Sequence, residues 1–73
     1  MNKMNKKMEY ALMALRLISQ RPANSLTSAK EVADQMHISF EVTARVLQAL
    51  SARGLLKAEY GVGGGYSLAR ALS

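Results

Sequence analysis

The chain has 73 residues, a length that allows one domain with a small hydrophobic core. Ten Lys and Arg against five Asp and Glu give a formal net charge of +5, which favours a polyanionic partner, either nucleic acid or an anionic membrane. No cysteine is present, so residues 1–73 cannot form a disulfide framework, a cysteine zinc site or a thiol nucleophile, and this composition agrees with a reducing cytoplasm.

The first predicted helix runs from about Lys7 to Ser19, after a polar segment, residues 1–6, that we expect to be frayed. Helical spacing predicts one main apolar face, made of Tyr10, Met13, Ala14, Leu17 and Ile18. The remaining apolar residues, Ala11, Leu12 and Leu15, widen this face beyond what a small core needs. Either a few of these side chains are exposed, or the helix has a second partner, a further chain segment or another subunit.

The same N-terminal stretch has some features of a signal peptide and of a membrane-surface helix. Glu9 and Arg16 interrupt its apolar region, and no small-x-small cleavage site follows, which argues against export. No apolar run approaches the roughly 20 residues that span a bilayer. We therefore expect a cytoplasmic protein with no membrane partner, whose first helix serves the core.

A loop at residues 21–24 and a very short strand at residues 25–27 are predicted next. Ser28 and Glu31 form a capping box, which predicts a helix over residues 29–36. Ser39 is a natural N-cap for a second helix over residues 40–53, and Gly54 fits the left-handed residue that ends it. His37 lies in the intervening turn, where a positive φ is expected. Two helices joined this tightly are typical of the helix-turn-helix, though also of any helical hairpin.

The second of these helices has two distinct faces. Its buried stripe is predicted from Thr43, Val46, Leu47 and Leu50, so the outward face carries Glu41, Ala44, Arg45, Gln48 and Ala52. Arg45 is the best candidate base reader, because its fork can pair with guanine O6 and N7. Gln48 could contact adenine or a phosphate, and Glu41 could accept a hydrogen bond from cytosine N4 or repel wrong bases.

After Gly54 the apolar period changes from about four to two. Residues 56–60 and 66–70 alternate on either side of the glycine-rich segment 61–65, which predicts a β-hairpin. Tyr60 and Tyr66 are expected to pack this hairpin. A phosphate-binding loop would need Gly-Lys-Ser/Thr where Gly65 is followed by Tyr66, so no nucleotide partner is expected. The glycines more readily let the hairpin tip approach a sugar–phosphate backbone.

Contacts to phosphate are predicted at residues with an N–H, a hydroxyl or a cationic side chain to offer. These candidates are Lys7, Lys30, Ser39, Lys57, and the backbone of Gly63 and Gly64. Catalytic and metal-binding patterns are not found: His37 is the one histidine, and the five acidic residues are scattered. The sequence therefore predicts a non-enzymatic protein with no metal site and no cofactor within these residues.

The predicted order is helix, short strand, helix, helix, strand, strand, a mainly α fold with a small β-hairpin known as the winged helix-turn-helix. With this order, the chain resembles the DNA-binding domain of the Rrf-two family of bacterial transcriptional regulators. The resemblance covers nearly the whole chain. Its matching residues are EYAL at 9–12, SAKEVA at 28–33, HIS at 37–39, RGLL at 53–56 and GGGYSLAR at 63–70.

That resemblance implies a DNA-binding domain over residues 1–73 and a sequence-specific regulator of transcription. Relatives include a regulator of iron–sulfur cluster assembly, a nitric-oxide-sensitive repressor and a repressor of cysteine metabolism. The family continues with a long dimerisation helix, which implies a homodimer. Many members also carry three cysteines that hold an iron–sulfur cluster, in which an acidic residue at the place of Glu9 can take part. Here a cluster is expected only if a cysteine-bearing region follows.

The chain departs from the family pattern at two places. The run Phe40–Arg45 differs from the usual start of the second helix, and Glu59-Tyr60 stands where many relatives have Val-Arg. These differences bear on base preference and remove a minor-groove arginine. Double-stranded DNA is the expected partner. The alternative is a winged-helix module that contacts proteins and has no sequence-specific affinity for DNA.

Overall fold

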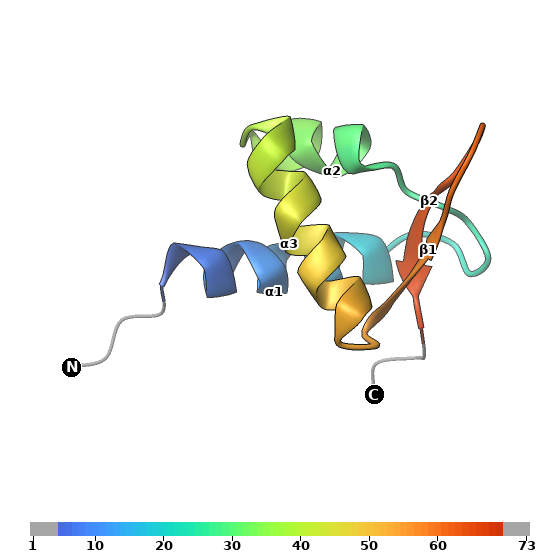
Figure 1. The fold of residues 1–73 in the computed structure, drawn as a ribbon, viewed down its shortest axis with the longest axis horizontal. Helices are drawn as coiled ribbons and strands as arrows, with labels where there is room; N and C mark the ends of the chain where they lie inside the picture. The colour runs from blue at the N-terminus through green and yellow to red at the C-terminus, as the bar shows by residue number, and fades with distance from the viewer. Residues whose placement is uncertain (1–4, 70–73) are drawn as a thin grey trace.

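The computed structural model describes residues 5–69 and contains three helices and one antiparallel hairpin (Figure 1). This arrangement confirms the predicted order of elements and the mainly α fold class. The elements are α1 (Lys6–Ser19), α2 (Ala29–Met36), α3 (Phe40–Ala52), β1 (Leu56–Glu59) and β2 (Gly65–Leu68). Helix α3 crosses in front of α1, α2 lies along one edge, and the hairpin stands beside the three helices (Figure 1).

The helix ends follow from local hydrogen bonds. The Ser28 hydroxyl accepts the Glu31 N–H at 3.1 Å while the Glu31 carboxylate accepts the Ser28 N–H at 3.1 Å, which confirms the capping box. His37 ends α2 in the left-handed region with a φ of 57°. Gly54 does the same after α3, with a φ of 81°, and the Leu55 N–H then reaches back to the Leu50 carbonyl at 3.0 Å.

The hydrophobic core lies where α1, α2, α3 and the base of the hairpin meet. Its most deeply buried apolar side chains come from a different helix each: Ala14 on α1, Val32 on α2 and Leu47 on α3. All four residues predicted to face inward on α3 are buried, which fixes the rotation of that helix. The other core members are Ile18, Met36, Val46, Leu50 and Leu56.

The hairpin pairs β1 with β2 in the register Leu56 to Leu68, Ala58 to Tyr66 and Glu59 to Gly65. The short strand predicted at residues 25–27 is reduced to a single bridge, in which Thr27 pairs with Tyr66. Strand β1 packs against α3, and β2 packs against α1. The hairpin is therefore held to the helical layer along its whole base, while its tip extends beyond the helices (Figure 1).

Some sequence predictions need correction. Helix α1 begins at Lys6 after an Asn5 cap, one residue earlier than predicted, and α3 ends at Ala52, one residue earlier. The segment expected to be frayed, residues 1–6, is ordered at its end, where Asn5 caps α1 and Lys6 begins it; its first four residues fall outside the described residues. Met13 is not part of the buried face: its side chain is 46 % exposed. Within residues 5–69, no helix has the length and apolar character that crossing a membrane requires.

Candidate nucleic-acid interface

Helix α3 presents a polar face away from the core. The buried residues of α3 fix its rotation, so four of the five positions predicted to face outward, 41, 44, 45 and 48, lie together on the opposite side. Glu41, Arg45 and Gln48 are exposed, and Ala44 between them is half-buried. Side chains at 41, 44, 45 and 48 are spaced three and four apart, so they form one continuous strip of the helix surface.

The start of α3 has free hydrogen-bonding capacity for an anion. The Ser39 hydroxyl caps the helix by accepting the Val42 N–H at 3.1 Å, which leaves its own proton available to donate. The positive end of the helix dipole also lies here. Lys30 is exposed in the first turn of α2. Lys7, by contrast, lies beside the C-terminal half of α3, near Ala49 and Arg53. It is therefore separated from the other predicted phosphate contacts at the start of α3.

The wing tip is a tight turn made by residues 61–64. The Gly64 N–H donates to the Gly61 carbonyl at 3.0 Å, and Gly63 at the third position has a φ of 76°, as a type II turn requires. A Cβ on Gly64 would collide with the Glu59 carbonyl oxygen, so the turn also depends on that glycine for close approach. Gly63 and Gly64 therefore lie at the predicted place, on the projecting tip.

The two wing tyrosines behave differently. Tyr66 packs partly buried against the core, as predicted, and this burial raises the pKa of its hydroxyl, with a smaller contribution from Tyr60. The prediction for Tyr60 was wrong, because its side chain is 90 % exposed. Tyr60 follows the last residue of β1, beyond the point where cross-strand pairing holds the chain against the helices.

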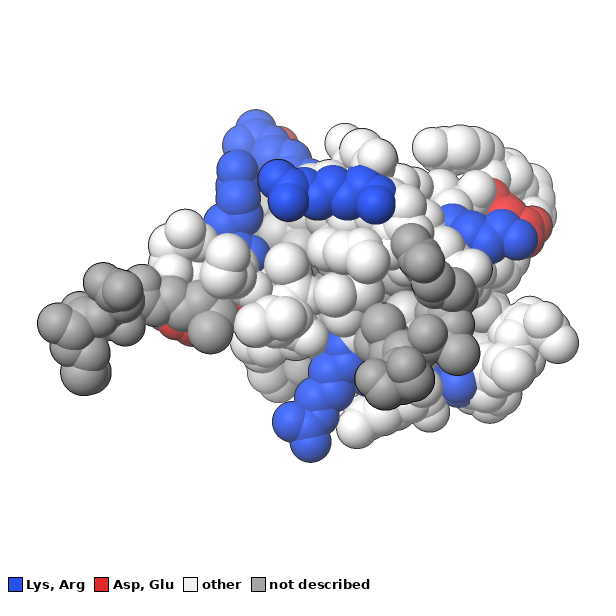
Figure 2. All heavy atoms as spheres, turned by 90° about the horizontal axis from the view of Figure 1, so that it is seen from below, with Lys and Arg blue, Asp and Glu red and all other residues white. Residues whose placement is uncertain are grey.

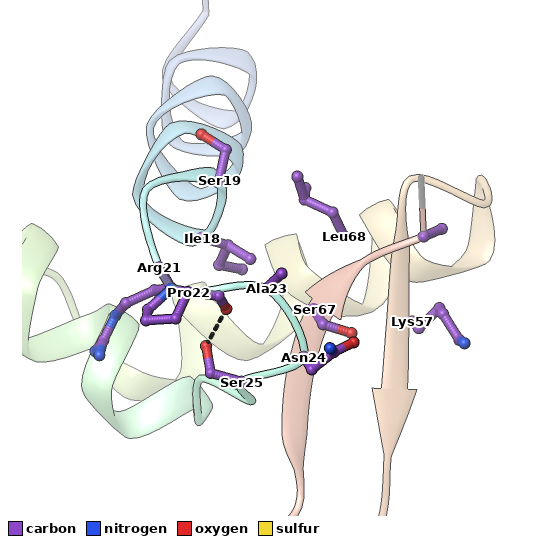
Figure 3. A pocket seen from close by; sticks show the side chains of 11 residues that line it. Ile18, Ser19, Arg21, Pro22, Ala23, Asn24, Ser25, Lys57, Ser67 and Leu68 are labelled. Carbon is purple, nitrogen blue, oxygen red and sulfur yellow. Dashed lines mark hydrogen bonds between the residues drawn. The ribbon is translucent and has the colours of Figure 1, made fainter. Parts of the chain in front are cut away.

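Lys57 lies at the base of the hairpin, beside a hollow of about 370 Å³ between the loop after α1 and β2, with a mixed polar and apolar lining. Figure 3 shows the Asn24 and Ser67 side chains close together there, while the Lys57 side chain extends to the other side of β1. The second cation at this hollow, Arg21, pairs with Glu31 at 2.8 Å. The polar groups thus do not converge on one point, and Lys57 remains a predicted phosphate contact.

An apolar groove of about 380 Å³ runs between α1 and the C-terminal half of α3. Leu15 and Val46 line it, together with Met8 and Leu12, whose side chains are more than half exposed. This exposure agrees with the predicted excess of apolar surface on α1, and apolar surface of this kind marks a contact region.

Two exposed apolar residues at the start of α3 were not among the predicted site residues. Phe40, the first residue of the helix, is 56 % exposed, and Val42 is also exposed. The sequence contains a signal for this exposure, because neither apolar residue belongs to the buried stripe formed by residues 43, 46, 47 and 50. Phe and aliphatic groups can contact the thymine methyl group in the major groove.

Charge on the surface agrees with an anionic partner. Figure 2 shows more Lys and Arg than Asp and Glu on the face in view, with several basic side chains gathered along its upper left edge. Among the acidic groups, the Glu31 carboxylate already accepts hydrogen bonds from the Ser28 N–H and from Arg21. These hydrogen bonds, first the one from the Ser28 backbone, lower its pKa.

Residues 1–73 do not provide the ligands of an iron–sulfur cluster, because such clusters are held by cysteine thiolates and the chain has none. No group of three or more His, Asp or Glu within residues 5–69 could hold a metal ion. Glu9 lies in the first turn of α1, where the helix dipole favours a carboxylate. The cluster role that the resemblance implies for Glu9 remains a prediction.

Three helices around one core, the third with one face buried and one exposed, and a projecting hairpin define a winged helix-turn-helix. Comparison with known proteins agrees with this class. The model of the Rrf2 family (the Rrf-two family named above), described as iron-dependent transcriptional regulators, matches residues 4–73. The chain belongs to this family.

Individual relatives support the same assignment. The regulator IscR of Cereibacter sphaeroides is 37% identical over 70 residues, which is 93% of this chain and 45% of that protein. The structure of CymR, the global cysteine regulator of B. subtilis, aligns with a TM-score of 0.90 and 27% identity over 97% of this chain and 55% of CymR. T. potens IscR aligns with a TM-score of 0.84 and 28% identity, over 96% and 51% of the respective chains. The chain thus spans about half the length of these relatives.

Proposed function

We propose that residues 1–73 act as the DNA-binding domain of a transcriptional regulator that recognises a specific DNA sequence. The observation that carries this proposal is the polar strip on α3. The helix is locked by four buried residues on one side and offers Glu41, Arg45 and Gln48 on the other. A basic protein of a regulator family with such a strip has what reading a major groove requires.

In this mechanism α3 enters the major groove with its N-terminal half. Arg45 pairs with guanine O6 and N7, and Gln48 with adenine or a neighbouring phosphate. Glu41 accepts from cytosine N4 or repels other bases, while Phe40 packs against a thymine methyl group. Ser39 and Lys30 hold phosphates beside the helix start, and these contacts fix orientation without reading sequence.

We further propose that the functional form is a homodimer that binds a pseudo-palindromic site in the cytoplasm. Each α3 would enter one half-site, with the half-sites about one helical turn apart. The exposed apolar groove between α1 and α3 supports an additional protein contact in the complete assembly. The cysteine regulation named for CymR is not carried over to this chain. An iron–sulfur cluster is not proposed for residues 1–73 either, because they contain no cysteine.

In vitro selection from a randomised duplex library, followed by titration at several salt concentrations, tests the proposal. A DNA-binding regulator should enrich one related set of sites and bind them at least about a thousandfold more tightly than random duplex. The alternative, a winged-helix module for protein contacts, predicts weak binding with no enriched sequence. Titration at several salt concentrations separates the phosphate contribution from base recognition.

A further inference from the structure

The wing tip carries an uncharged apolar surface that the α3 mechanism does not use. Tyr60 is 90 % exposed, and Val62 two residues later is fully exposed. Residues 60–65 contain no Lys or Arg, and the nearest charged residue in the sequence is Glu59. Counterion release requires cations placed against phosphates. The side chains of this tip therefore cannot contribute to DNA binding by that route.

The tip is also preorganised. Residues 61–64 form a turn closed by the Gly64 N–H to Gly61 carbonyl bond of 3.0 Å, and Glu59 pairs with Gly65 directly below it. Both apolar side chains are thus attached to a backbone whose position is set before any ligand arrives. Binding through a preorganised element loses less conformational entropy than binding through a disordered loop.

The position of the tip relates it to the proposed interface. Strand β1 packs against α3, so the base of the hairpin is held directly against the recognition helix. In Figure 1 the tip projects beyond the helices toward the same edge of the molecule as α2 and the start of α3. A duplex with α3 in its major groove presents an adjacent minor groove to such a projecting element.

We propose that Tyr60 and Val62 enter the minor groove beside the α3 contact and pack against its sugar walls and base edges as an apolar wedge. This inference rests on the proposed DNA-binding function. The minor groove is about 6 Å wide, and proteins that enter it insert apolar side chains there. Glycines on both sides of Val62 leave room for the backbone to approach the strands.

This chemistry has a characteristic sequence preference. A·T pairs present only acceptors on the minor-groove floor, whereas guanine adds its N2 amino group. An apolar side chain gains nothing from that amino group and is obstructed by it. The wing therefore favours A·T pairs over G·C pairs where it enters the groove, and its contribution to affinity does not depend on salt.

The experiment uses the complete chain and a duplex enriched from a random library with the wild-type protein. The double variant Tyr60→Ala/Val62→Ala should bind this duplex about tenfold more weakly. The slope of log affinity against log salt should not change, because no phosphate contact is lost. Both side chains are exposed, so their truncation leaves no cavity in the core, and Tyr60→Phe should keep the wild-type affinity.

Two controls isolate the wing. Met13→Ala truncates an exposed apolar side chain on α1, outside the wing and α3, and should leave affinity unchanged. In a version of the selected duplex whose base pairs beside the α3 site are changed to G·C, replacing guanine by inosine removes the N2 amino group while keeping the major-groove atoms O6 and N7. This replacement should strengthen binding of the wild type several-fold and leave the double variant unaffected.

Several results would overturn the proposal. One is a site-selective wild type whose double variant keeps full affinity, which would leave the function of α3 intact. Another is an equal response of both proteins to inosine. A double variant that loses self-association but not DNA affinity would assign the tip to a protein partner. Wild-type protein that binds selected and scrambled duplexes equally would remove the proposed function itself, and the wing proposal with it.

Discussion

Thr27 and Tyr66 exchange a pair of backbone hydrogen bonds: the Thr27 N–H donates to the Tyr66 carbonyl at 2.9 Å, and the Tyr66 N–H to the Thr27 carbonyl at 2.8 Å. This bridge joins the loop before α2 to β2, which pairs with β1 on its other side. It therefore contributes to the angle at which the hairpin leaves the helices. The Thr27 side chain is drawn into the interior, where its hydroxyl has no hydrogen-bond partner among the described residues.

The unpartnered hydroxyl leads to the first prediction. Thr27→Val keeps the shape of the side chain and removes a buried polar atom, so we expect it to stabilise the fold by about 1 kcal/mol. Thr43 is the matched control, because it is equally buried but its hydroxyl donates to the Ser39 carbonyl at 2.8 Å. Thr43→Val should instead destabilise. Urea unfolding of the three proteins measures both changes, and a destabilised Thr27→Val would show that the hydroxyl has a partner.

The capping box and the ion pair at Glu31 predict a pH dependence. The Ser28 N–H, and then Arg21, lower the pKa of this carboxyl below 4.5 in the folded protein. A carboxyl with a lowered folded pKa stabilises the fold above its unfolded pKa, and that contribution is lost as the pH falls through the folded pKa. Stability should therefore decrease as the pH is lowered below 4.5.

Glu31→Gln is the variant that tests this origin. Glutamine preserves the capping-box acceptor but carries no charge, so the pH-dependent part of the stability should shrink. Thermal unfolding of wild type and variant between neutral pH and about pH 3 provides the comparison. The same slope in both proteins would mean that other carboxyl groups dominate the acid response.

Gly54 allows a purely conformational test. Its φ of 81° lies in the left-handed region, yet a Cβ at this position would meet nothing within 4 Å. Gly54→Ala should therefore cost about 1–2 kcal/mol from backbone strain alone. Gly54→Asn should cost less, because asparagine tolerates this conformation better. Equal losses for the two variants in chemical denaturation would contradict the conformational explanation.

Lys30, proposed to hold a phosphate, and Lys57, a predicted phosphate contact, should both affect the salt dependence of DNA binding. Lys30→Ala and Lys57→Ala should each weaken binding to selected and random duplexes alike, and each should lower the salt slope by about one. Fluorescence anisotropy at four or more salt concentrations would be sufficient to measure the slopes. For Lys57, which lies beside the hollow at the hairpin base, an unchanged slope would exclude it from the phosphate contacts.

The sequence was most informative where a single residue type meets a single physical demand. Ser28, Ser39 and Gly54 marked helix ends correctly because capping and positive φ are local requirements. The inward face of α3 was also predictable, because its apolar stripe is narrow. For α1 the rotation was predicted less well, since almost every residue from 10 to 18 is apolar and only packing against α2, α3 and β2 decides which face is buried.

The end of strand β1 in the wing could not be predicted from the sequence. Alternation in residues 56–60 predicts a strand but does not tell where pairing ends. In the structure it ends at Glu59, so Tyr60 falls outside the packed part and is exposed. The direct contacts to DNA are even harder to predict from the sequence, because they depend on how the surface strip of α3 docks against a duplex.

The central claim is that the outward strip of α3 reads DNA sequence, and Arg45 offers its most direct test. Affinities of wild type and Arg45→Ala should be compared at one salt concentration on the selected duplex and on a scrambled duplex. The variant should lose about 1–3 kcal/mol on the selected duplex and relax the preference at one base pair, with a much smaller loss on the scrambled duplex. Equal losses on both duplexes would contradict base reading by Arg45 and leave it only a phosphate contact.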